Sequence, residues 1–182
     1  PEMPSLPSLQ DTTRINVRYP LIEPYAYAHI YWDQATNELV YQVEEPPLNE
    51  SEAMLLETIE NGIFELLNIS FINVSDTNTI VAYLEKNIKV LLAELGVKVT
   101  EEIFLKLIYY VYRDFVGLNE IEPLMKDYFI EDIECNGANT PLYIVHRKYR
   151  NLRTNITFSD MDKLSSFVEK LAQKCGKYVS YA

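Results

Sequence analysis

Residues 141–158 read PLYIVHRKYRNLRTNITF. The stretches 141–146 and 152–158 are rich in β-branched and aromatic residues, which predicts two strands. The polar residues 148–151 between them predict the turn of a hairpin. Four Lys and Arg residues fall within 146–153, in a chain whose net charge is -11. This hairpin predicts that the C-terminal part of the chain is built on an antiparallel sheet.

The sequence around this hairpin completes a small α/β subdomain over residues 117–182. Upstream, residues 118–126 predict a short helical turn, and residues 130–135 predict a strand that ends at the turn pair Asn136-Gly137. Downstream, Ser159 is the expected cap of a last helix that stops at Gly176. Its predicted apolar face consists of Met161, Leu164, Phe167, Val168, Leu171 and Cys175.

The N-terminal part predicts a second hairpin. Tyr25, Tyr27, His29 and Tyr31 alternate with smaller residues, which indicates a strand over 25–32. Turn-forming residues 33–37 follow, and residues 39–43 can return as its partner strand. Residues 1–24 contain Pro1, Pro4, Pro7, Pro20 and Pro24 and predict an extended arm.

Three amphipathic helices are predicted between the hairpins. The first begins at Asn49, with Glu52 in capping-box spacing, and buries Leu55, Ile59, Ile63 and Leu66. The second begins near Ser75 or Asp76, buries Ile80, Leu84, Ile88, Leu91 and Leu95, and stops at Gly96. The third is capped by Thr100, buries residues that include Ile103, Leu107, Tyr110 and Val111, and ends at Gly117. Each helix is apolar on one side, so a three-helix bundle is expected.

These elements predict an α+β fold with three parts. An extended arm covers residues 1–24, a β-hairpin with the helical bundle covers 25–116, and the antiparallel-sheet subdomain with its C-terminal helix covers 117–182. The boundary is placed near Gly117.

Charge is divided unevenly along the chain. Residues 1–142 carry 8 Lys and Arg against 24 Asp and Glu, whereas residues 143–182 carry 8 against 3. The acidic part argues against nucleic acid as a general partner, because phosphates would be repelled over most of the surface. The two ends are expected to face different partners. The simpler alternative is a solvated acidic face with one basic turn.

Recognisable enzymatic motifs are absent. The sequence has no G-x-x-x-x-G-K-S/T phosphate loop, no G-x-G-x-x-G and no G-x-S-x-G. His29, His146, Cys135 and Cys175 lack metal-ligand spacing, so no metal is expected. Two cysteines are too few for a secreted disulfide framework, and no apolar run reaches the roughly 20 residues of a membrane span. We therefore expect a cytoplasmic chain that is not itself an enzyme.

Arg147 and Arg153 are the leading candidate site residues. On paired strands alternate residues share a face, so the two could project together from opposite sides of the turn. Two guanidiniums in a fork suit a phosphate group. The alternative is an exposed turn whose charges only keep a sheet edge soluble.

The same region resembles the N-terminal domain of type II/IV secretion ATPases, and among them the archaeal members that drive secretion, pili and the archaellum. The resemblance rests on residues 117–118, 121–127 (IEPLMKD), 130–133 (IEDI), 136–137 (NG), 143–149 (YIVHRKY) and 152–156 (LRTNI). Residues 19–26 (YPLIEPYA) and 44–48 (EEPPL) add to it. The likeness is strongest over 117–182.

The resemblance implies a piece of a hexameric motor. A RecA-like core with the phosphate loop follows this region in the family, so ATP and Mg²⁺ are expected in a full-length parent and no cofactor in the residues given. Arg147 and Arg153, and less directly Arg150, match basic residues that lie near nucleotide. Implied partners are the parent's own ATPase core, neighbouring subunits and a membrane platform protein, which would place the chain at the inner face of the membrane. The fragment alone is expected to be a monomer.

Two other functions stay open. A stand-alone adaptor could use the acidic bundle and aromatic strand to bind proteins and have no nucleotide role. A single-strand nucleic-acid binder could stack bases on Tyr143 and Tyr149 beside the arginines, although the charge of the rest opposes it. A reading frame that continues into a phosphate loop would favour the motor over the adaptor.

Overall fold

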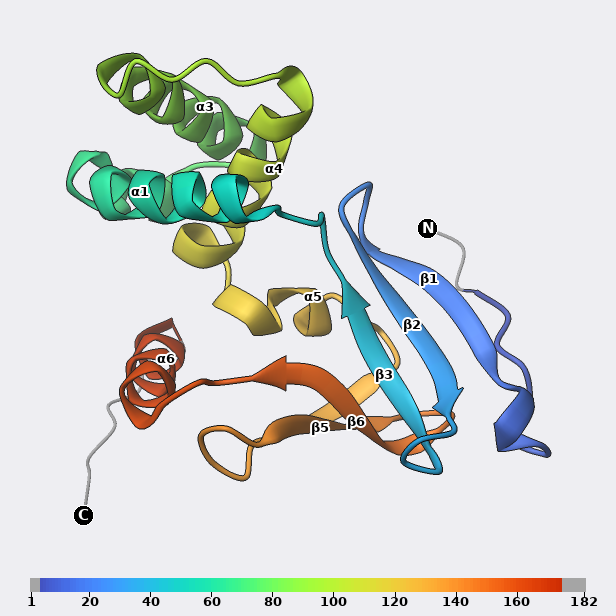
Figure 1. Ribbon diagram of the computed structural model, residues 1–182. Helices are drawn as coiled ribbons and strands as arrows, with labels where there is room; N and C mark the ends of the chain where they lie inside the picture. The colour runs from blue at the N-terminus through green and yellow to red at the C-terminus, as the bar shows by residue number, and fades with distance from the viewer. Residues whose placement is uncertain (1–3, 175–182) are drawn as a thin grey trace. The chain divides into compact units, whose positions relative to one another are not determined.

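The computed structural model describes residues 4–174 and has an α+β fold (Figure 1). It divides into two compact units. The sheet unit combines the chain up to Glu45 with the chain from Glu120 onward, and the helical unit is Pro46–Asn119. The predicted last helical residues Cys175 and Gly176 lie outside the described part.

One six-stranded mixed sheet forms the first unit, in the order β1-β2-β3-β6-β5-β4. The strands are β1 (Asn16–Ile22), β2 (Ala26–Asp33), β3 (Glu38–Glu44), β4 (Ile130–Glu134), β5 (Pro141–His146) and β6 (Arg150–Thr157). The shorter elements are η1 (Thr12–Arg14), η3 (Asn119–Ile121) and α5 (Glu122–Met125), and the chain continues into α6 (Met161–Lys174). Neighbouring strands are antiparallel except β3 and β6, which are parallel.

Both predicted hairpins are confirmed as strand pairs. In β2 the residues Ala26, Ala28 and Ile30 are buried, and the aromatic residues between them point to the other face. In β5 and β6 the same alternation buries Leu142, Ile144, Leu152 and Ile156. The period-two pattern identified these strands because one face of each is covered by the core.

The predicted arm is instead partly folded. Residues 16–22 form β1, an edge strand that pairs with β2 and buries Tyr19. Pro20 is tolerated there because an edge strand leaves one row of its N–H groups without a strand partner. Leu6 is also buried. Proline content predicted an arm, whereas burial of Leu6 and Tyr19 fixes this segment to the sheet.

The seam between the two hairpins is the parallel contact of β3 with β6. Its register includes Val40 with Arg153 and Tyr41 with Thr154. Beyond it, Asn155 accepts from the Val43 N–H at 2.8 Å and donates to the Val43 carbonyl at 3.0 Å. The seam joins β1–β3 and β4–β6 into one unit, and residues 46–119 form the other. The prediction instead grouped the first hairpin with the helices over 25–116 and placed the boundary at Gly117.

The helical unit contains more segments than the three that were predicted. They are α1 (Glu50–Leu66), α2 (Ile69–Val74), α3 (Thr77–Glu94), α4 (Glu101–Val111) and the π-helical turn η2 (Tyr112–Val116). The capping box of Asn49 with Glu52 is confirmed, and Asp76 and Thr100 cap α3 and α4. Gly96 has a φ of 65°, as a left-handed terminator requires.

The predicted apolar faces need two corrections. The buried stripe of α1 is Leu56, Ile59 and Ile63, and Leu66 is exposed. Leu95 is also exposed, because it lies past the last turn of α3. In the sheet unit, α6 begins at Met161, and Asp160 rather than Ser159 accepts from the Lys163 N–H.

Candidate functional site

A buried histidine, His146, accepts hydrogen bonds from the backbone of the turn between β5 and β6. The ring atom Nδ1 of His146 accepts hydrogen bonds from the N–H groups of Lys148 at 3.1 Å and Tyr149 at 3.2 Å. The His146 ring stacks against Tyr149 on one side and Phe129 on the other, with centroids 5.0 and 5.3 Å apart. His146 is 1% exposed. The turn is thus built on a buried, satisfied imidazole.

The N-terminal segment fixes the same turn from another direction. Tyr149 donates its hydroxyl to the Pro7 carbonyl at 2.9 Å, and Lys148 donates its ammonium to the Leu6 carbonyl. Lys148 is therefore committed to the backbone of the segment near the N-terminus. The turn consequently displays its two remaining cations, Arg147 and Arg150, from a fixed backbone.

Arg147, on this turn, and Arg150, which directly follows it, are both exposed. The Arg147 guanidinium lies 4.4 Å from the Tyr128 ring centroid and 3.9 Å from Glu131. These are weak, solvent-screened contacts. Arg150 starts β6 with a φ of 64°, and within residues 4–174 its side chain has no ion-pair, hydrogen-bond or ring partner.

Arg153 lies elsewhere. It occupies the outer face of β6 opposite Tyr143, and its Nε is 3.1 Å from Glu38. Its Nη2 is 3.4 Å from Asp33 and 3.3 Å from the Thr36 hydroxyl. Arg153 is thus bound to the β2–β3 hairpin.

The expected fork of Arg147 and Arg153 is not formed. Arg147 contacts the β4 side of the β5–β6 hairpin, whereas Arg153 contacts the β3 side. The prediction assumed that both arginines lie on paired strands, where alternate residues share a face. β5 ends at His146, so Arg147 lies on the turn and this alternation does not apply to it. Arg147 instead shares the β5–β6 hairpin end with Arg150, the first residue of β6.

A shallow groove of about 240 Å³ adjoins Arg153 on the outer face of the sheet. Its lining includes Tyr31, Asp33, Gln42, Arg153, Asn155 and Thr157. The pKa of Asp33 is lowered, mainly by the hydrogen bond that its carboxyl accepts from the Ala35 N–H, so this carboxyl stays ionised. With Asp33 and Glu38 beside one arginine, the groove is poorly suited to an anion.

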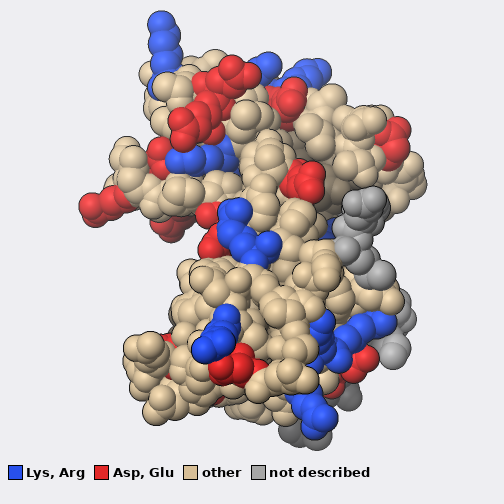
Figure 2. Space-filling model, turned by 90° about the vertical axis from the view of Figure 1, so that its right-hand side faces the viewer, with Lys and Arg blue, Asp and Glu red and all other residues tan. Residues whose placement is uncertain are grey.

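Charges are also balanced on another part of the surface. Arg18 pairs with Glu44 at 2.6 Å and covers the Tyr27 ring at 3.8 Å, and His29 lies between Asn16 and Glu44. On the face drawn in Figure 2, Lys and Arg side chains lie in separate groups, several of them beside carboxylates. Among the described residues of the sheet unit, these pairings leave Arg18 and Arg153 beside carboxylates, which is unfavourable for binding a nucleic-acid backbone.

Sequence reasoning missed a buried polar network beneath the turn. Tyr19 and Tyr41 both donate to Oδ2 of Asp127 at 2.6 Å, and Asp127 Oδ1 accepts from the Phe129 N–H at 2.8 Å. Burial, followed by the charge of Asp127, raises the pKa of both tyrosines far above the ordinary value, so they remain donors. Asp127 is 7% exposed. The network joins residues of β1 and β3 to the turn that precedes β4.

His146 completes this network. Because its Nδ1 accepts two N–H groups, a neutral ring carries its proton on Nε2, which lies 3.2 Å from the Tyr19 hydroxyl. Burial lowers the pKa of His146 to about 4. The sequence did contain one sign of this network, because His146 follows Leu142 and Ile144 at the buried positions of β5. Its partners could not be inferred, since they come from three other segments.

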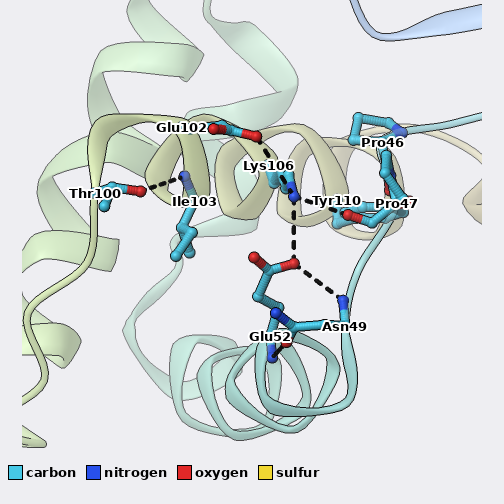
Figure 3. Close-up of polar contacts among 9 residues, drawn as sticks. All are labelled: Pro46, Pro47, Asn49, Glu52, Thr100, Glu102, Ile103, Lys106 and Tyr110. Carbon is cyan, nitrogen blue, oxygen red and sulfur yellow. Dashed lines mark hydrogen bonds and ion pairs between the residues drawn. The ribbon is translucent and has the colours of Figure 1, made fainter.

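The helical unit has its own polar cluster where the chain enters α1 (Figure 3). Lys106 of α4 donates to the Pro47 carbonyl at 2.9 Å and lies 3.3 Å from Glu52. Tyr110 donates to the Pro46 carbonyl at 2.6 Å. The pKa of Glu52 is lowered mainly by the hydrogen bond that it accepts from the Asn49 N–H, and further by the nearby Lys106. Every group here is used to fix α1 to α4, so we assign this cluster a structural role.

Within residues 4–174, no three His, Cys, Asp or Glu side chains converge as a metal ion would require. No described helix combines the length and apolarity needed to cross a membrane.

Comparison with known proteins gives two relatives without a stated function. The chain is 35% identical over 153 residues to the uncharacterized protein MJ1288 of Methanocaldococcus jannaschii, which covers 84% of this chain and 60% of that protein. It is 34% identical over 90 residues to the uncharacterized protein MJ0900 of the same organism, covering 50% of this chain and 16% of that protein. No family model matches. The chain therefore matches only part of each relative's length.

Proposed function

We propose that this chain is the non-catalytic regulatory and coupling region of a hexameric secretion or pilus-assembly ATPase of the archaeal type. In this proposal the β5–β6 turn contacts nucleotide held by an ATPase core in the same protein or a neighbouring subunit. A platform protein at the inner face of the membrane would receive the motion. ATP and Mg²⁺ would belong to the core and not to the residues described.

The observation that carries the proposal is the rigid display of Arg147 and Arg150. Their backbone is fixed by His146, and their guanidiniums are not committed to buried carboxylates. A phosphate contact needs charged donors on a preorganised support, because each mobile side chain loses entropy on binding. The resemblance of residues 143–149 to the motor family and the greater length of both relatives agree with this reading.

The test is ATP turnover in the full-length protein at saturating nucleotide. An arginine aimed at the transferring phosphate contributes about 10³–10⁵ in rate in other nucleotide hydrolases, so Arg147→Ala or Arg150→Ala should lower turnover by about 10³. Arg153→Ala should have a smaller effect, because Glu38 and Asp33 hold that side chain. Arg14→Ala is the matched control, since Arg14 is an exposed arginine of the same unit.

Wild-type turnover in all three variants would remove the nucleotide role. It would favour a second function, an adaptor that only binds proteins. One observation supports that alternative: Met54 and Phe64 of α1 are 64% and 65% exposed. A reading frame without a phosphate loop would point the same way.

A further inference from the structure

The helix α1 has two different faces. Its inner face buries Leu56, Ile59 and Ile63 in the helical unit. At 100° per residue, Met54 points almost directly away from this stripe, and Phe64 lies roughly 110° around the helix from it. Both side chains are exposed, although the Phe64 ring also lies 6.4 Å from the Phe115 ring, centroid to centroid. Large apolar side chains on the outside of a helix are informative when they recur on one face.

Glutamates surround these two side chains. Glu50, Glu57 and Glu65 project from the same side of α1 and are exposed. We call the set Glu50, Met54, Glu57, Phe64 and Glu65 the outer face of α1. No Lys or Arg occurs in the sequence between Arg18 and Lys86, so neighbouring residues of α1 and α2 supply no compensating charge.

The charge of this face limits what can cover it. An anionic membrane surface or a nucleic acid would be repelled by the glutamates. A second copy of α1 would bring the same glutamates against each other. A partner must therefore bring apolar side chains for Met54 and Phe64 together with positive charges for the glutamates between and beside them.

We propose that the outer face of α1 docks a basic amphipathic helix of a partner protein. Met54 and Phe64 are ten residues apart, which is roughly 15 Å along the helix, so the partner helix needs about three turns to reach both. Apolar anchors would supply most of the binding free energy, and the glutamates would set orientation and select against acidic partners. This inference does not depend on the proposed nucleotide contact.

The test uses the whole 182-residue chain and a synthetic helical peptide made of leucine and lysine with helical periodicity. Binding is measured by isothermal titration calorimetry at low and at moderate salt. We expect Met54→Ser with Phe64→Ser to weaken binding at least tenfold, which is about 1.4 kcal/mol. Glu57→Lys with Glu65→Lys should weaken it by a similar factor and remove most of its salt dependence.

The matched control is Val90→Ser with Glu94→Lys on α3, which changes another exposed apolar residue and another exposed glutamate. This variant should bind like the wild type. Circular dichroism would show whether each variant keeps its helices. A peptide with glutamate in place of lysine should not bind.

Three results would overturn the proposal. They are no binding of the leucine-lysine peptide, equal loss of affinity in the α3 control and the α1 variants, and binding of the wild type to anionic phosphatidylglycerol vesicles in place of the peptide. The second result would mean that the peptide senses only the net charge of the chain. The arginine variants of the β5–β6 turn should bind the peptide normally, so failure here and failure of the nucleotide role are separable.

Discussion

The two units of this protein depend on buried polar groups to different extents. The sheet unit has Tyr19, Tyr41, Asp127 and His146 in its interior and pairs many of its outer charges with each other. The interior of the helical unit is mostly apolar, with side chains such as Ile59, Leu84 and Leu107. Its polar contacts include the helix caps, the Lys106–Glu52 contact and the buried ion pair of Arg113 with Asp114. It also leaves large apolar side chains exposed.

This difference follows from how each unit is assembled. Helices bury an apolar stripe and satisfy most of their own backbone, so the helical unit needs fewer polar groups in its interior than the sheet unit does. The sheet unit joins two hairpins that are about a hundred residues apart in sequence, and polar side chains bridge their seam on both faces. We therefore expect the sheet unit to depend on hydrogen bonding and pH, and the helical unit to depend on packing. Trp32, the single tryptophan, lies in β2 and reports the sheet unit.

The largest expected effect is at Asp127. Asp127→Ala leaves the Tyr19 and Tyr41 hydroxyls and the Phe129 N–H without their acceptor, which should cost about 4 kcal/mol of unfolding free energy. Urea denaturation followed by Trp32 fluorescence measures it. Asp127→Asn keeps acceptor oxygen and should lose less. A loss in Asp127→Ala below about 1 kcal/mol would mean that water replaces the carboxylate easily.

Leu84→Ala tests the interior of the helical unit. Leu84 is fully buried in α3, and its truncation should cost about 3 kcal/mol through lost transfer free energy and a cavity. The loss should appear in far-ultraviolet circular dichroism and be the same at pH 5 and pH 7. Val90→Ala, at an exposed position of the same helix, should change stability by less than about 0.5 kcal/mol. A strongly pH-dependent loss in Leu84→Ala would contradict the proposed contrast.

His146 should make the sheet unit sensitive to acid. Its pKa is lowered from 6.5 to about 4 by burial, so the unfolded chain binds a proton more readily between these values. The contribution of His146 to the free energy of unfolding is fully present above pH 6.5 and is lost as the pH falls from 6.5 toward 4. Below pH 4 this residue causes no further change. The difference between these pKa values corresponds to at most about 3 kcal/mol of unfolding free energy.

Trp32 fluorescence in urea at several pH values measures this loss. His146→Phe should flatten the profile between pH 6.5 and 4, whereas His29→Gln, at the chain's other histidine, should not. An unchanged profile in His146→Phe would assign the acid sensitivity to another group.

The smallest expected effect is at the seam. Asn155→Ala removes two hydrogen bonds to the backbone of Val43 and should cost about 1 kcal/mol, because the site is partly open to water. Trp32 fluorescence measures it. Thr157→Ala, an exposed position on the same face of β6, is the control. Equal stability of both variants would show that the β3–β6 contact does not need the Asn155 clamp.

Much of the secondary structure could be predicted from single segments. The strand alternation of β2, β5 and β6, the caps at Asn49 and Thr100, and the terminator Gly96 each depend on a few neighbouring residues. β1 was missed because the prolines of residues 1–24 predicted an extended arm, and because pairing with β2 depends on the fold. The candidate site was predicted in part: Arg147 and Arg150 are on the turn, but the pairing of Arg147 with Arg153 depended on a turn boundary that the sequence does not specify.

The sequence by itself determined the α+β composition, the two hairpins, the helices α1, α3, α4 and α6, and the acidic and basic division of the chain. Periodicity and caps act within a few residues, so they can be inferred without the fold. Only the tertiary structure decided that β3 pairs with β6, that Arg153 is bound to Glu38, and that Asp127 gathers two tyrosines beside His146. Backbone hydrogen bonds between strands can form with almost any sequence, so strand partners and buried polar networks are set when distant segments pack together.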